Sequence, residues 1–493
     1  MMVRVEWPLH VVRRIVFGVV TAAVLAVGGW FLVSWLQESQ ARCGAGVVKM
    51  GDDAECVGVT DGSYTFAGHL APVEKKIRQE NAKVAKGEDS YVSVAYMTSF
   101  TLKDDDSNSS ESVRHELEGA YLAQYRYNEG DLGGKPKIRL LLANTGSRSA
   151  HWRHTVGELT ARADDKQGRL VAVTGLGPST DENLAAIREL SKKGIAMVAS
   201  TMTATDIQDI HNFVRVSPTN VDEAYAAAGY LKRNKFKTAV VVQDAAKGNL
   251  YAGTLGPAFT RAFPDKAGHR LVAETKTFDS SVRSAWQTEL RFMSVELCAQ
   301  KPQVIYFAGR GIHLTSFLDS LANRNCQSEQ FTVIAGDDTS NLTADKLADA
   351  AATKINVLYT GLAHPDMYKK NPDAVSAPSA KFFAEGAELD RWFPNDSRDD
   401  GQAIMAHDAV LTAATGVQMA ASSQGEVVGD AVARMFHQMD GGQQVAGASG
   451  FLSFQNNGNP RDKAVPVLRL TAQGRAVFVE VSAANGRPRE KNG

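Results

Sequence analysis

The feature that most limits the fold is a regular alternation of short apolar segments with helix-like segments, beginning at Tyr91. The apolar segments are nearly continuous in Val, Leu, Ile and Ala, as strands buried on both faces are. Segments with apolar residues at helical spacing separate them. This order predicts an α/β fold with parallel sheets. The predicted strands are 91–100, 138–146, 170–177, 195–201, 238–244, 272–278 and 304–311.

The strand and helix units are too many for one short open sheet, so we expect two sheets in two lobes. Three segments, 213–218, 357–365 and 447–454, have the form of strands that cross from one lobe to the other. The first ends at Pro218, just before a capping pattern at Thr219-x-x-Asp222. Lobes joined by several short connections enclose a cleft and close on something small.

The expected boundaries follow from these crossings. Lobe 1 comprises residues 91–218 and 363–447, and lobe 2 comprises residues 219–362 and 448–484. Residues 37–90 are expected to form a stalk, and residues 485–493 a C-terminal tail.

Three polar turns follow predicted strands, where ligands of open α/β sheets bind. In the turn 175–180, Ser179 begins a Ser-x-x-Glu capping pattern, and its hydroxyl and backbone N–H groups suit an anion or simply cap a helix. Thr201 and Thr203 lie in a second turn, as polar ligand contacts or ordinary loop residues. Asp337 and Asp338 lie in a third, where they face a cationic group or cap a helix.

The order of these segments, with NFVRVSPTN and GFLSFQNNGNP, resembles the type I periplasmic-binding-protein fold over about Tyr91 to Val481. The resemblance is to the branched-chain amino acid (Leu/Ile/Val) binding branch of the ABC transporter substrate-binding proteins. It implies two Rossmann-like lobes joined by a three-strand hinge. It also implies roles for six residues: a ligand carboxylate held by Ser179, Thr180, Thr201 and Thr203, an ammonium held by Asp338, and a cover formed by Tyr251.

Two departures from that family affect the ligand. Arg310 stands where the family usually has a small or aromatic residue, and it either meets an anionic side chain of a ligand or reaches water. The acidic run 104–106 follows the first strand, where the family is shorter. We read this run as a solvated loop that makes the entrance acidic.

The charge balance and the motifs exclude several classes of function. Lys plus Arg number 54 and Asp plus Glu 55, so the chain has no overall basic field for nucleic acid. HExxH, GxSxG and GxxxxGK[ST] motifs are absent from the sequence, and His151 and His154 have no acidic or cysteine neighbour at ligand spacing. We therefore expect no enzyme, no cofactor and no metal.

An uncharged apolar run at 15–36 predicts a single transmembrane helix. At ~1.5 Å per residue it reaches about 33 Å, enough to cross the hydrocarbon core of a bilayer. Arg4, Arg13 and Arg14 precede it, which places residues 1–14 in the cytoplasm and the bulk of the chain outside the cell membrane. A cleaved signal peptide is the alternative, because residues 39–41 form a small-x-small triplet.

All four cysteines follow this run, on the oxidising side of the membrane. Their positions suggest two local disulfides, Cys43 with Cys56 and Cys298 with Cys326, out of three possible connectivities.

We therefore expect a membrane-anchored extracytoplasmic solute-binding protein that closes two lobes on a small amino-acid-like ligand or a related amide. Its membrane partner is an ABC-type permease. The alternative is a tethered sensor or adaptor of the same fold that acts through a signalling partner without transport.

Overall fold

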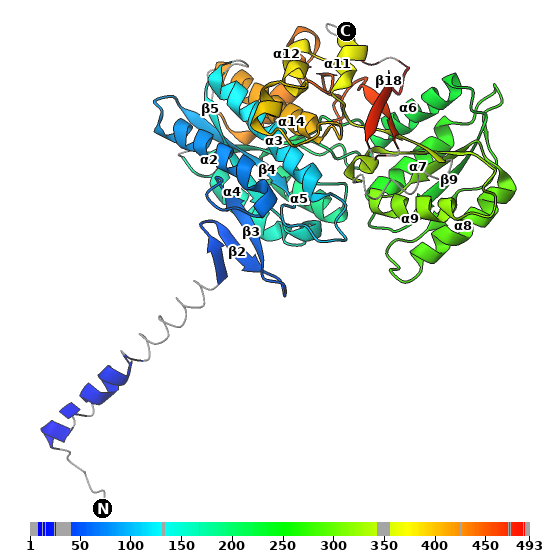
Figure 1. Ribbon diagram of the computed structural model, residues 1–493. Helices are drawn as coiled ribbons and strands as arrows, with labels where there is room; N and C mark the ends of the chain where they lie inside the picture. The colour runs from blue at the N-terminus through cyan, green and yellow to red at the C-terminus, as the bar shows by residue number, and fades with distance from the viewer. Residues whose placement is uncertain are drawn as a thin grey trace, which may run out of the picture.

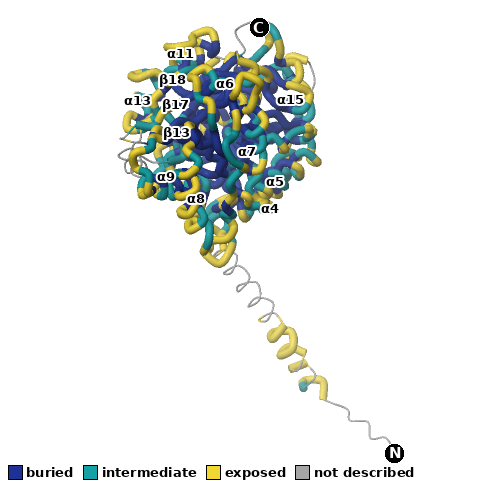
Figure 2. The backbone as a smooth tube through the Cα atoms, turned by 90° about the vertical axis from the view of Figure 1, so that its right-hand side faces the viewer, coloured by how far each residue is buried: buried dark blue, intermediate teal, exposed yellow. Residues whose placement is uncertain are grey.

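Two lobes side by side form the body of the molecule in the computed structural model (Figure 1). The structure describes residues 8–11, 13–14, 16–23, 25, 41–130, 134–166, 168–342, 355–423, 426–471, 473, 475–486 and 488. Each lobe contains one mixed sheet covered by helices on both faces. Figure 2 shows the buried backbone concentrated inside these layers.

The first lobe is built on an eight-stranded sheet in the order β1-β2-β3-β5-β4-β6-β7-β8. Strands β5, β4, β6, β7 and β8 are parallel, whereas β1, β2 and β3 are joined antiparallel at one edge. The strands are β1 Arg42–Gly44, β2 Val47–Met50, β3 Glu55–Thr60, β4 Tyr91–Thr98, β5 Lys137–Asn144, β6 Leu170–Gly175, β7 Ala196–Ala199 and β8 Phe213–Arg215.

Alternate side chains of each central strand enter two different cores, because successive residues of a strand point to opposite faces. In β4, Val94 and Tyr96 pack with one helical layer, and Ala95 and Met97 pack with the other. The first layer contains α2 Ala71–Lys86, α3 Ser110–Glu129, α14 Gln402–Ser422 and α15 Gly429–Phe436, and the second contains α4 Trp152–Ala163 and α5 Asp181–Lys192. The near-continuous apolar sequence of the strands follows from this double burial.

The second lobe repeats the arrangement on a sheet in the order β10-β9-β12-β13-β14-β17-β18, with β11 also paired to β9. The strands are β9 Thr238–Asp244, β10 Arg270–Leu271, β11 Lys276–Phe278, β12 Val304–Ala308, β13 Phe331–Ala335, β14 Ile355–Thr360, β17 Val465–Leu470 and β18 Ala476–Ser482. Helices α6 Asn220–Arg233 and α7 Leu250–Ala262 cover one face, and α8 Trp286–Gln300 and α9 Gly311–Ala322 cover the other. Only the last three residues of the predicted strand 272–278 form a strand, β11, and β10 precedes the predicted range.

Three connections join the lobes. The chain leaves the first sheet after β8, returns after β14, and enters the second sheet again between β16 Phe451–Leu452 and β17. Strand β16 pairs with β15 Val445–Ala446 in a separate small sheet. We expected strands to make these crossings, but β8 belongs only to the first sheet and β14 only to the second, so the loops after them cross.

The expected stalk at 37–90 is wrong for its described part. Strand β3 pairs with β5, and β1 and β2 extend the same sheet. Helix α2 packs on the sheet through Val73, Ile77 and other apolar residues. The buried residues of β3 and the apolar face of α2 give this segment a place in the first lobe, which a solvated stalk would not require. Between β14 and α14 lie three short helices, α11 Asp366–Lys370, α12 Ala377–Ala380 and α13 Glu388–Trp392.

Both expected disulfides are present, Cys43–Cys56 between β1 and β3 and Cys298–Cys326 between α8 and the loop that follows α9. The expected transmembrane run 15–36 lies mostly outside the described residues, which include only 16–23 and 25 of it. In the part of the chain that is described, no helix has the length and apolar character needed to span a bilayer.

Gly119 sets how closely α3 and α14 pack. A Cβ atom at Gly119 would lie 1.8 Å from the backbone oxygen of Ala403 in α14. We expect Gly119→Ala to force the helices apart and to lower the free energy of unfolding by at least ~2 kcal/mol. The matched variant is Gly157→Ala in α4, where a Cβ meets nothing within 4 Å. It should stabilise by up to ~1 kcal/mol. Denaturant midpoints measure both, and equal midpoints would contradict the packing argument.

Candidate functional site

A cavity of about 1120 Å³ lies between the two lobes. The loops after β4, β5 and β6 of the first lobe line it, together with the loops after β9, β11 and β12 of the second. All six loops leave the carboxyl ends of their strands, so the two sheets present the same kind of edge to one space. Ligands of open α/β sheets bind at this edge.

The predicted site residues fall into two groups in this structure. Thr180 and Arg310 line the cavity. The other five surround it without lining it: Ser179, Thr201, Thr203, Tyr251 and Asp338. Four of these five are nearly fully buried, and Thr201 is half-buried.

Ser179 connects the turn after β6 to the turn after β7 through hydrogen bonds. Its Oγ accepts hydrogen bonds from the backbone N–H of Thr203 at 3.1 Å and of Ala204 at 3.0 Å. The hydroxyl of the next residue, Thr180, caps α5 by accepting from Asn183 N at 3.3 Å. The predicted capping role therefore belongs to Thr180, and Ser179 holds the turn after β7 in place.

Arg310 and Asp338 form an ion pair at the inner end of the cavity. Arg310 Nη1 lies 3.3 Å from Asp338 Oδ1, and Nη2 donates to the backbone oxygen of Ser179 in the other lobe at 2.6 Å. The guanidinium also lies over the Tyr251 ring, 4.9 Å from its centroid. The arginine that departs from the family pattern is thus fixed between the lobes.

A second pair of acids, Glu223 and Asp337, lies behind this ion pair. Glu223 is fully buried, and its Oε2 accepts from Asp337 N at 3.2 Å and from Thr360 Oγ1 at 2.8 Å. Burial raises the pKa of Glu223 well above its usual range, and the negative charge of Asp337 raises it further. Thr203 Oγ1, from the first lobe, donates to Asp337 Oδ1 at 3.4 Å.

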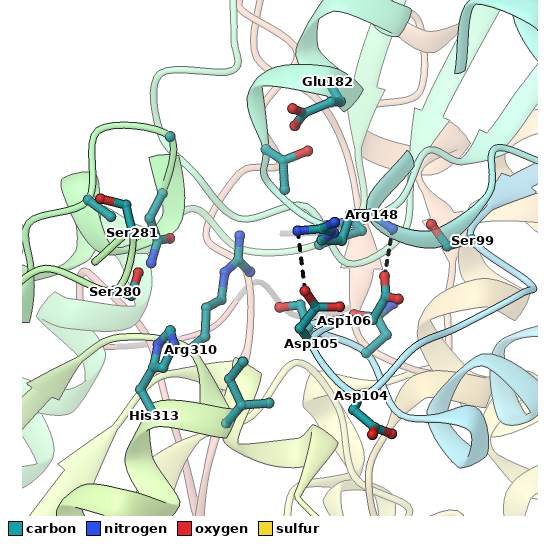
Figure 3. A pocket seen from close by; sticks show the side chains of 18 of the residues that line it. Ser99, Asp104, Asp105, Asp106, Arg148, Glu182, Ser280, Ser281, Arg310 and His313 are labelled. Atoms are coloured by element: carbon teal, nitrogen blue, oxygen red, sulfur yellow. Dashed lines mark hydrogen bonds and ion pairs between the residues drawn. The ribbon is translucent and has the colours of Figure 1, made fainter. Parts of the chain in front are cut away.

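The acidic loop of the first lobe contacts both lobes, and Figure 3 shows its Asp105 and Asp106 beside Arg148. Asp105 forms ion pairs with Arg148 of its own lobe, at 3.2 Å, and with Arg283 of the other lobe, at 2.6 Å. Asp106 is buried and accepts from Ser147 Oγ and from the backbone N–H of Arg148. Asp104 and Asp105 are exposed, as expected for a solvated loop, whereas Asp106 is buried, and all three aspartates line the cavity.

Sequence reasoning missed several lining residues, among them Arg148, Glu182, Arg283, Trp286 and His313. Helix α8 begins at Trp286, so the half-buried ring lies at the end of the helix beside the cavity, 4.8 Å from the His313 ring. Their position in the sequence could have identified two of them, because Arg148 and His313 each follow a predicted strand within a few residues.

The two sandwiched sheets and the three connections define the type I periplasmic-binding-protein fold, as the sequence predicted. No family model and no curated protein matches this sequence.

Among solved structures, a leucine-binding protein from Thermotoga maritima is similar, with 19% sequence identity and a TM-score of 0.59 over 79% of this chain and 98% of that one. A branched-chain amino acid transporter substrate-binding protein from Streptococcus pneumoniae, in complex with isoleucine, has 15% identity and a TM-score of 0.59 over 80% and 100%. An ABC transporter solute-binding protein from Rhodopseudomonas palustris, in complex with 3,4-dihydroxybenzoic acid, has 14% identity and a TM-score of 0.56 over 81% and 98%.

The buried acid pair makes a prediction about pH. Because the folded pKa of Glu223 is raised, its contribution to stability is full below the unfolded pKa of about 4.3 and is lost as pH rises through the folded value. Each unit of that difference corresponds to ~1.4 kcal/mol. Glu223→Gln cannot ionise, so its urea midpoint should fall less between pH 5 and pH 8 than that of the wild type. Asp206→Asn, at an exposed position, is the control. Equal slopes in wild type and Glu223→Gln would contradict the assignment.

Proposed function

We propose that this protein is an extracytoplasmic solute-binding protein, anchored in the cell membrane by residues 15–36, that closes its two lobes on a small amino-acid-like solute. The observation that supports this most is the cavity between the facing strand ends of two lobes joined by three connections. Binding makes or breaks no covalent bond; the solute shifts the population toward the closed form.

Direct contacts between the lobes support a closing motion. Arg283 of one lobe meets Asp105 of the other, Thr203 meets Asp337, and Arg310 meets the backbone of Ser179. All these groups are polar, so opening the cleft would return them to water at modest cost. A solute that contacts both lobes adds to the same set of contacts and therefore favours closure.

The size and lining of the cavity support a small polar solute. Its volume is in the range of small-molecule sites, and charged and hydroxyl side chains from both lobes face it. In this proposal Thr180 contacts the solute, and Ser179, Thr201, Thr203, Tyr251 and Asp338 hold the loops that shape the site. The leucine and isoleucine named for two structural neighbours support an amino-acid-like solute.

The position of the first lobe supports a partner in the membrane. Residues 37–41 separate the apolar run from β1, and at ~3.6 Å per residue they span at most about 18 Å. An anchored chain therefore keeps its first lobe beside the bilayer. We propose that the closed form is read there by an ABC-type permease.

Solute binding is testable with the full chain in detergent. A panel of the common amino acids, small amides and small carboxylic acids should include at least one compound that raises the melting temperature. A ligand at 100 times its Kd adds ~2.7 kcal/mol to stability. Ala246→Trp places an indole at the cavity wall and should abolish the shift. Ala299→Trp, exposed on α8, should retain it. A folded protein that responds to no compound would contradict the proposal.

The anchor is testable by fractionation. The full chain should remain with membranes after an alkaline wash, whereas a chain that begins at residue 41 should be released, because it lacks the apolar run. Mass spectrometry of the membrane-bound protein should find the original N-terminus. A product that begins near residue 42 would instead identify a cleaved signal peptide.

A further inference from the structure

We propose that Arg310 binds the solute, and that the group it binds is a carboxylate of the solute. The class of solute is then a monocarboxylic acid with a flat or apolar body, recognised without an ammonium group at Asp338. This inference rests on the proposed solute-binding function and specifies its chemistry. Three observations carry it: the saturation of Asp338, the open N–H groups of Arg310 and the distribution of charge around the cavity.

The carboxylate oxygens of Asp338 already accept from donors of the protein, so none is left for the ammonium group of a ligand. Its Oδ2 accepts from Gly311 N at 2.6 Å, and its Oδ1 lies within 3.3–3.4 Å of donors on Arg310, Asn341 and Ser107. The residue is 4% exposed and does not line the cavity. An incoming ammonium would have to displace the guanidinium already paired with this carboxylate, and it would leave that cation buried and unpaired, which is costly.

Arg310, in contrast, lines the cavity and has donors to spare. A guanidinium carries five N–H groups. One is directed to Asp338 and one to Ser179 O, so the other three have no acceptor within the part of the chain that the structure describes. Figure 3 shows the side chain extending between the Ser280–Ser281 loop and the Asp105–Arg148 pair. Its planar fork matches a carboxylate, which accepts two parallel N–H bonds.

The guanidinium is also held in place, so a ligand does not bear the entropic cost of ordering it. Arg310 is the N-cap residue of α9, its charge is paired with Asp338, and it lies over the Tyr251 ring. A pre-organised donor set binds more tightly than a flexible one. In this arrangement Asp338 and Tyr251 are positioning residues that act through Arg310.

The remaining charges of the cavity limit the solute to one acid group. The other two arginines of the lining, Arg148 and Arg283, already share Asp105. Asp104, Asp181 and Glu182 also line the cavity, and no cation within the described residues pairs with them. A second carboxylate on the solute would meet these acids, so dicarboxylates are disfavoured, whereas hydroxyl or amino groups at the far end are accommodated.

The space beside Arg310 suits a body larger than an aliphatic side chain. The cavity of about 1120 Å³ exceeds the volume of a single leucine several-fold, and Trp286 provides a flat aromatic wall. An aromatic ring or an N-acyl group would pack there. A free α-amino acid would fill only part of this space.

Leucine derivatives that each lack one charged group test the inference on the full chain in detergent. N-acetyl-leucine keeps the carboxylate without an ammonium, and leucinamide keeps the ammonium without a carboxylate. Isothermal titration should show binding of N-acetyl-leucine and of benzoate, with affinity at least tenfold higher than for leucinamide. Arg310→Gln should lose at least tenfold of the affinity for N-acetyl-leucine. Arg310→Lys should lose less, and the exposed-site control Arg261→Gln should lose none.

A second variant keeps the test decisive if Arg310→Gln fails to fold. Asp338→Asn removes the acid that would receive an ammonium and keeps a side chain of the same size beside the guanidinium. Because this change also removes the charge that positions Arg310, the affinity for N-acetyl-leucine should fall, but N-acetyl-leucine should still bind more tightly than leucinamide, and leucinamide binding should not change. Leucinamide binding that is lost in Asp338→Asn, or N-acetyl-leucine binding that survives in a folded Arg310→Gln, would overturn the inference while leaving solute binding intact. Absence of binding by all three probes, and by the wider panel, would overturn both proposals.

Discussion

The architecture depends on the burial of parallel strands on both faces. Strands such as β4 and β9 have no polar face, so each sheet must be covered by two helical layers. Every strand-to-helix connection on that sheet then opens at the same edge. When two such lobes are joined by three short connections, their strand ends face each other, and the cavity forms between them. The position of the cavity thus follows from the way in which the helices bury the apolar faces of the two sheets.

Charged groups at this edge are satisfied largely by each other. Arg310 pairs with Asp338, Asp105 pairs with two arginines, and Glu223 lies against Asp337 with a raised pKa. These contacts come from loops that are far apart in the sequence, and the pair of Asp105 with Arg283 crosses between the lobes. The resulting cavity has one fixed cation with open donors at its inner end and uncompensated acids elsewhere on its lining, which gives it a definite polarity.

The family resemblance predicted the location of the site more accurately than the orientation of its side chains. The turns expected to hold a ligand are at the correct edge, yet Ser179 and Thr203 use their polar groups within the protein. The neighbours share the fold at 14–19% identity, and at that distance the loops can be rebuilt around a different ligand. In this structure Arg310, which departs from the family pattern, is paired with Asp338, the acid expected at the ligand.

The sequence by itself indicated the strand and helix order from Tyr91 onward, the two lobes and the three connections, because apolar periodicity is a local signal. It also suggested both disulfides, out of three possible connectivities, from the positions of the cysteines. It also marked Arg310 as the residue that departs from the family. Tertiary structure alone decided that residues 42–60 join the first sheet, since edge pairing with β5 depends on backbone groups distant in the sequence. It alone decided which polar residues face the cavity, because a hydroxyl or carboxylate at a strand end points to ligand or protein according to partners on other loops.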